Sequence, residues 1–149
     1  MLTKIFLATF AVCAIVLSAG ISTSVNAQNR CGSTRFNAAN LLVIGLPSGR
    51  RLVCFSELSP SRLDNIGQVT GLSGDTALIG IDYRVQDGRL YGVGNAGGVY
   101  TISTVDGSAT LVNNLTVALS GTAFGVDFNP AADRLRIISN TGQNLRHNV

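Results

Sequence analysis

Short alternations of apolar and polar positions dominate the chain beyond its N-terminal segment. Runs such as Leu78–Tyr83, Val99–Ile102 and Leu135–Ile138 are rich in β-branched and aromatic side chains. Clusters of glycine, asparagine, aspartate and proline separate these runs, as at Asp87-Gly88 and Asn129-Pro130. Short strands divided by glycine-bearing turns are typical of an all-β domain, so we expect antiparallel strands here.

The pattern repeats with a period of about 45 residues. Gly80-Ile81-Asp82-Tyr83 corresponds to Gly125-Val126-Asp127-Phe128, and Arg89 corresponds to Arg134. A period of this length, built from short strands, is that of the blades of β-propellers. We therefore predict propeller-like repeats of short antiparallel strands over residues 28–149.

The repeat also predicts the faces of each sheet, because side chains alternate along a strand. Ile79, Ile81 and Tyr83 share one face, and we expect the apolar side of residues 124–128 in the next copy to cover it. The opposite face is small or acidic. Gly80 has a matching glycine one repeat later, which indicates that another backbone packs close there.

The N-terminal residues 1–27 have the order of a secretory signal peptide. Lys4 supplies a positive charge, Ile5–Leu17 is an apolar run of thirteen residues, and Val25-Asn26-Ala27 fits a cleavage site. The run is too short to span a bilayer, which takes about 20 apolar residues. We expect cleavage after Ala27 and an exported domain, periplasmic or extracellular, at residues 28–149. An uncleaved N-terminal anchor is the alternative.

The charge and cysteine composition limits the classes of partner expected for that exported domain. Without Lys4 it has ten arginines against eight acidic residues, and they are scattered. A nucleic-acid binder usually has a basic stripe with a larger excess, so we expect no nucleic-acid partner, and no membrane span once the signal is removed. Cys31 and Cys54 remain after cleavage. A disulfide is favoured in an oxidising compartment, with two free thiols as the alternative.

The chain offers little catalytic or cofactor chemistry. Gly92–Gly97 matches the glycine-rich dinucleotide pattern, but a strand pattern at Gly98–Ile102 follows where that fold needs a helix, so we interpret it as a hairpin turn. His147 is the single histidine and lies near the C-terminus. We therefore assign no catalytic, cofactor-binding or metal-ligating residue and expect no cofactor.

Two aspartates recur at equivalent positions, each followed seven residues later by an arginine. They are Asp82 with Arg89 and Asp127 with Arg134. Because the aspartates recur at equivalent positions, a repeated structural role is favoured, either in an Asp–Arg pair or as an acceptor for turn amides. Calcium coordination and acid–base catalysis are the alternatives.

Two segments carry a resemblance to a known family. Leu78–Arg84 followed by Gly88–Gly92, and Leu119–Pro130 followed by Asp133–Arg136, resemble the repeats of the domain of unknown function 4394 (DUF4394) family. The resemblance runs from about Asn40 to the end. It implies a secreted, propeller-like β-repeat domain and adds no catalytic residue, because the family has no assigned activity.

The same resemblance implies that the chain is the front part of a longer domain. The domain of the family runs past the position that matches Val149. Residues 28–149 hold about 2.7 repeats of this length, whereas closed propellers have roughly 4–8 blades. We therefore expect a fragment whose last repeat has an unpaired sheet edge, which favours self-association.

The leading functional hypothesis is an exported, non-enzymatic module for binding or for cell-envelope architecture. The alternative is a secreted hydrolase or lyase whose active site lies on the blade loops, in part outside this chain. Asn114-Leu115-Thr116 is also an acceptor pattern for glycosylation, although such triplets are common by chance.

Overall fold

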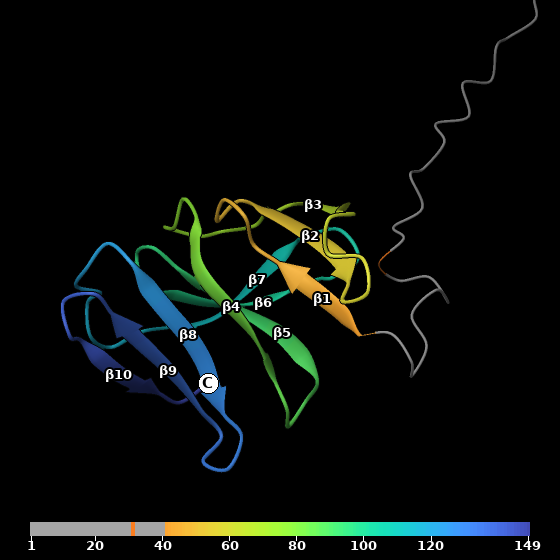
Figure 1. The fold of residues 1–149 in the computed structure, drawn as a ribbon. Coiled ribbons are helices and arrows are strands. Elements are labelled where there is room, and N and C mark those ends of the chain that lie inside the picture. Colours follow the sequence, from red (N-terminus) through yellow and green to blue (C-terminus); the bar gives the residue numbers. More distant parts are fainter. Residues whose placement is uncertain (1–30, 32–40) are drawn as a thin grey trace, which may run out of the picture.

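The computed structural model describes Cys31 and residues 41–149, which form ten β-strands (Figure 1). The strands are β1 (Leu42–Gly45), β2 (Arg51–Ser56), β3 (Asp64–Gln68), β4 (Leu78–Arg84), β5 (Arg89–Gly94), β6 (Gly98–Ile102), β7 (Ala109–Asn114), β8 (Phe124–Asn129), β9 (Arg134–Ser139) and β10 (Asn144–His147). The signal peptide expected at residues 1–27 lies outside the described residues. Within the described part, no helix is long and apolar enough to cross a membrane.

The strands form three antiparallel sheets in sequence order. The first sheet has the order β1-β2-β3, the second β4-β5-β6-β7 and the third β10-β9-β8. Figure 1 shows the second sheet in the middle, with the first and third sheets on either side of it. Within each sheet, every strand pairs with its neighbour in the chain, as short connections allow. The expected all-β class is confirmed.

The repeat found in the sequence has a structural counterpart in the second and third sheets. β5 and β9 begin at equivalent residues, Arg89 and Arg134, and the turn before each contains a residue with positive φ. That residue is Gly88, with φ of 67°, in one copy and Asp133, with φ of 48°, in the other. Glycine and aspartate both tolerate this left-handed conformation, so the same turn forms from different residues.

A hydrogen-bonded asparagine side chain also recurs, next to the start of the second sheet and next to the start of the third sheet. Asn95 Oδ1 accepts hydrogen bonds from the amides of Thr76 and Ala77, at 2.9 and 3.2 Å. Asn140 Oδ1 accepts the equivalent hydrogen bonds from the amides of Thr122 and Ala123, just before β8, at 3.0 and 3.3 Å. Each asparagine therefore fixes the segment that enters its own sheet.

The second and third sheets pack through one apolar cluster. Its buried members are Tyr91, Val93, Val99, Phe128, Leu135 and Ile137. The rings of Tyr91 and Phe128 meet edge to face with centroids 5.3 Å apart. Val126 fills the space above Gly80, where an added Cβ would lie 2.5 Å from Val126 Cγ2. Removing these side chains from water holds the two sheets face to face.

The expectation that the next repeat covers one face of β4 holds for Ile79, which packs in the cluster of Phe124 and Val126, but was wrong for Ile81 and Tyr83. Ile81 packs toward the first sheet, and the side chain of Tyr83 is 43% exposed. Val126 instead covers the face that carries Gly80. A register shift near the start of β4 also separates Ile79 from Ile81, so that the two pack in different clusters. Gly80 has no side chain and leaves space that the branched side chain of Val126 fills. This fit determines which face of β4 the third sheet covers.

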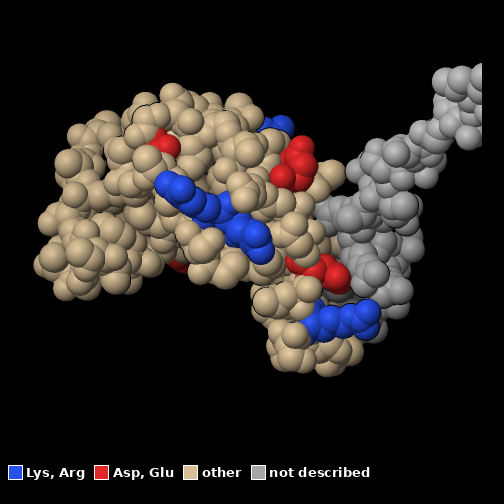
Figure 2. Space-filling view, turned by 90° about the horizontal axis from the view of Figure 1, so that it is seen from above, with Lys and Arg blue, Asp and Glu red and all other residues tan. Residues whose placement is uncertain are grey.

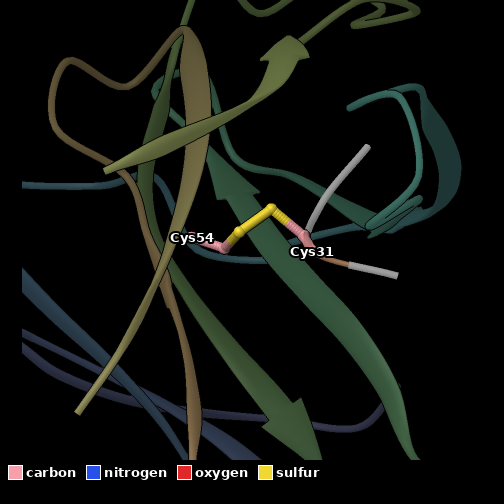
Figure 3. Close-up of a disulfide and its surroundings, with 2 residues drawn as sticks. All are labelled: Cys31 and Cys54. Atoms are coloured by element: carbon pink, nitrogen blue, oxygen red, sulfur yellow. A yellow bond between two sulfur atoms is a disulfide. The ribbon is translucent and has the colours of Figure 1, made fainter. Parts of the chain in front are cut away.

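The first and second sheets share a second apolar cluster, which contains the disulfide between Cys31 and Cys54 (Figure 3). The two Cα atoms are 5.9 Å apart, and the bond closes a separation of 23 residues. Closing a loop of this length stabilises a fold by about 3 kcal/mol in the chain-entropy description. The bridge therefore ties Cys31 to β2 in the interior of the domain.

Charged side chains are sparse on the visible surface. Figure 2 shows arginine side chains in separate groups, next to acidic ones, on a face that is mostly uncharged. The most extended of these groups is a short band across the middle of the face.

Candidate functional site

Asp82 lies in the interface between the second and third sheets. It pairs with Tyr91 of β5 in the strand register, and its Oδ2 accepts a hydrogen bond from the backbone N–H of Phe128 at 2.6 Å. The donor is a strand amide of the next repeat rather than the turn amide we expected. Asp82 therefore ties β4 to β8.

Asp127 occupies the equivalent position one repeat later but has a different environment. It is exposed, and within the described part of the chain its carboxylate makes no hydrogen bond or ion pair. Because side chains alternate along β8, Asp127 points away from β4 while Val126 points toward it. Strand β8 thus separates the carboxylates of Asp82 and Asp127, and they do not form an acid–base pair.

Arg89 and Arg134 do not form the expected pairs with the two aspartates. The ion pairs in the described part of the chain all involve Arg84. The guanidinium of Arg134 donates to two backbone carbonyls of the preceding turn, at 3.1 and 2.9 Å. Asp82 is turned toward β8, and Arg89 is exposed with no acidic partner among the described residues.

The glycine-rich turn binds a carboxylate from the chain itself. Asp75 accepts hydrogen bonds from the amides of Ala96 and Gly98 and lies 2.5 Å from the hydroxyl of Tyr100. An added Cβ at Gly94 or Gly98 would lie within 2.3 Å of this carboxylate. The glycines therefore make room for Asp75, in agreement with the interpretation of this segment as a hairpin turn.

A charged cluster joins the β4–β5 turn to the β8–β9 turn. Arg84 binds Asp133 through two parallel hydrogen bonds, Nε to Oδ1 at 2.8 Å and Nη2 to Oδ2 at 2.5 Å. Its Nη1 also donates to Asp87 at 3.2 Å, and Asp87 accepts a bond of 2.8 Å from the Tyr91 hydroxyl. A bidentate pair of this kind sets geometry as well as energy, so the cluster fixes the two turns relative to each other.

The pKa values of the cluster follow from these contacts. The hydrogen bond with Asp133 raises the pKa of the Arg84 guanidinium, and the same contact lowers the pKa of the Asp133 carboxyl. Burial by itself would raise the pKa of Asp87, but hydrogen bonds from the Arg89 amide, Tyr91 and Arg84 bring it below its usual range. Burial and the bond to Asp87 raise the pKa of Tyr91. All four groups keep their ordinary ionisation at neutral pH.

A groove of about 390 Å³ opens beside this fixed turn, between the β4–β5 turn and the β6–β7 connection. Leu90 and Ile102 are the apolar residues in its lining, and both are buried. The remaining lining is polar and consists of Tyr83, Gly88, Arg89, Thr101, Ser103, Thr104, Ser108 and Thr110. Five serine and threonine residues, one tyrosine and one arginine therefore contribute to the lining of a single concave surface.

Arg89 gives the groove a positive charge, whereas the hydroxyls of Ser103 and Ser108 are hydrogen-bonded to Asp106 beside it. Arg89 is exposed, and its guanidinium makes no hydrogen bond or ion pair within the described residues. No carboxylate is among the residues that line the groove. Burial raises the pKa of Tyr83, so its hydroxyl stays a hydrogen-bond donor at neutral pH.

His147 and Asn114 lie away from this groove. The Nε2 of His147 is 2.9 Å from Oδ1 of Asn113, and burial lowers the pKa of the imidazole. Asn114 is exposed at the end of β7. In the described part of the chain, no three acidic, histidine or cysteine side chains come together as a group that could hold a metal ion.

Comparison with known families agrees with the resemblance seen in the sequence. The family described as domain of unknown function (DUF4394) matches residues 51–149. The chain belongs to this DUF4394 family. No curated protein and no solved structure matches it. The match covers the second and third sheets completely, together with both turns of the charged cluster.

The sequence did not reveal the charged cluster or the groove of this DUF4394 domain. Arg84 and Asp133 are 49 residues apart, so no local pattern pairs them. The positions at which the two copies differ are a signal that could have indicated the charged cluster. Arg84 has Asn129 one repeat later, and Asp133 takes the place of Gly88. Arg84 and Asp133 occupy different positions of the repeat, so their ion pair joins one copy to the next.

Proposed function

We propose that this DUF4394 chain is an exported binding module whose ligand site is the groove beside the β4–β5 turn. The observation that carries the proposal is the lining, in which serine and threonine residues accompany Arg89, whose guanidinium has no ion pair within the described residues. A volume of about 390 Å³ falls within the range of small-ligand sites. The cluster around Arg84 supports the proposal, since it holds the turn that carries Arg89 in place.

The chemistry of the lining favours an acidic saccharide as the ligand. Serine and threonine hydroxyls both donate and accept, so they match the hydroxyls of a sugar. The partly exposed ring of Tyr83 offers an apolar surface for a sugar face. Arg89 has the planar fork that binds carboxylate or sulfate groups through two hydrogen bonds. With no acidic side chain in the lining, the groove favours a negatively charged ligand.

Binding is tested on a glycan array that displays uronic-acid, sialylated, sulfated and neutral oligosaccharides. We expect signal from acidic members, and calorimetry on the strongest of them should give saturable binding. Loss of a hydrogen bond to a charged group costs about 1.5–3 kcal/mol, so Arg89→Met should weaken binding by about 10- to 100-fold. The matched control is Arg136→Met, an exposed arginine on β9 outside the groove, which should bind normally. Absence of binding to every acidic saccharide, or equal loss in both variants, would refute the groove as the site.

Export is a separate part of the proposal and has its own test. The apolar run of residues 5–17 and the disulfide between Cys31 and Cys54 support it. Expressed in a secreting bacterium, the protein recovered outside the cytoplasm should begin at Gln28 by mass spectrometry. An intact N-terminus on that material would contradict cleavage after Ala27.

A further inference from the structure

The groove beside the β4–β5 turn has a counterpart in the next repeat. Leu90 lines the groove and belongs to the apolar cluster that the first and second sheets share. Leu135, one repeat later, belongs to the cluster that the second and third sheets share. The face of the second sheet on which the groove opens therefore corresponds to the face of the third sheet that packs against the second sheet.

At that counterpart, an acidic side chain reaches the preceding sheet. Asp133 lies in the turn before β9 and binds the guanidinium of Arg84 on β4. The hydrogen bonds with Arg84 are the main cause of the lowered pKa of Asp133, and the charge of Arg134 lowers this pKa further. A carboxylate at this position of the repeat is therefore directed at the preceding sheet and interacts with the arginine that follows it in the chain.

Gly88 is the equivalent residue in the second sheet and leaves the same place open. It lies in the lining of the groove, directly before Arg89, and an added Cβ there would meet no described atom within 4 Å. The φ of Gly88 is 67° and that of Asp133 is 48°, in the left-handed region that aspartate and asparagine adopt more readily than most residues. The turn would therefore accept an aspartate, and the glycine keeps a carboxylate out of the groove.

We infer that Gly88 determines the charge selectivity of the groove, because its missing side chain leaves room beside Arg89 for the acidic group of a ligand. The inference rests on the proposed function, since it concerns the same groove. An aspartate at this position would place a second negative charge next to that group and would compete for Arg89. Juxtaposed like charges oppose binding strongly, so a groove with this aspartate would reject an acidic ligand.

Gly88→Asp tests the inference, and Gly88→Asn is the matched control because it has nearly the same size and no charge. The probe is the uronic-acid, sialylated or sulfated oligosaccharide that gives the strongest signal with the wild-type protein on the glycan array. By calorimetry at neutral pH, we expect Gly88→Asp to bind this probe at least about tenfold more weakly than Gly88→Asn. Thermal melts by circular dichroism should show that both variants fold, since Asp133 already adopts this turn conformation.

A second control separates the position of the charge from its presence. Val85→Asp adds the same charge to the same turn, at a residue that is 71% exposed and outside the groove lining, and it should bind the probe as the wild-type protein does. Equal affinities of Gly88→Asp and Gly88→Asn would overturn the inference, as would equal losses in Gly88→Asp and Val85→Asp. In either case the groove itself stands if Arg89→Met weakens binding. A wild-type protein that binds no acidic oligosaccharide would instead refute the groove, and the inference with it.

Discussion

The hydrogen bond between Asp82 and β8 provides a sharp test of how adjacent repeats are joined. Asp82 Oδ2 accepts the Phe128 amide at 2.6 Å, whereas the equivalent Asp127 is exposed with no such partner in the described part of the chain. Asp82→Ala removes the acceptor and leaves a strand amide unsatisfied between two sheets. Asp127→Ala makes the same chemical change at the equivalent position of the next repeat, so it is a matched control.

The magnitude follows from the charge and the partial burial of Asp82. A hydrogen bond to a charged group contributes about 1.5–3 kcal/mol, and the lower end applies because Asp82 is only half-buried. We therefore expect Asp82→Ala to lower the free energy of unfolding by about 1.5 kcal/mol. For a domain near 100 residues this lowers the melting temperature by about 6 °C. Asp127→Ala should change stability by less than about 0.5 kcal/mol.

Urea unfolding and thermal melts at neutral pH, followed by circular dichroism, measure both variants against the exported wild-type protein. Asp82→Asn adds a third point, because it keeps an acceptor oxygen and loses only the charge. Its stability should fall between those of the wild-type protein and Asp82→Ala. Equal losses for Asp82→Ala and Asp127→Ala would refute the reasoning, since only Asp82 has the contact with β8.

Two further predictions concern the same pair of sheets. Gly80→Ala should destabilise the domain by about 1–3 kcal/mol in urea unfolding, because the new Cβ would overlap Val126, while Gly125→Ala should cost clearly less. The contact with Arg84 lowers the pKa of Asp133, so the unfolded chain binds more protons near the usual aspartate pKa of about 3.9. That contribution is complete above this pH and is lost as the pH falls through the folded-state pKa. Arg84→Met should therefore make stability less dependent on pH below about 4, and an unchanged acid profile would contradict the role of the pair.

Local chemistry made the class and the repeat period of this domain predictable from sequence. Alternating side chains and glycine-bearing turns indicate strands wherever they occur, because both act over a few residues. The spacing of Asp82 from Asp127 gave the period, and β4 and β8 lie in corresponding places in adjacent sheets. The family assignment came from the same local motifs and is confirmed over residues 51–149.

Contacts between sheets were decided by the tertiary structure. Equivalent residues such as Asp82 and Asp127 have similar local sequences, yet in the described part of the chain only Asp82 has a neighbouring sheet on its side of the strand. The face of β4 that becomes buried depends on the hollow at Gly80 and on a register shift, which alternation alone does not reveal. Arg84 meets Asp133 because two turns from different repeats are brought together by packing. The residues of a repeat determine where its strands form, because strand formation depends on local sequence. The contacts of each strand depend on the side chains of the neighbouring sheet.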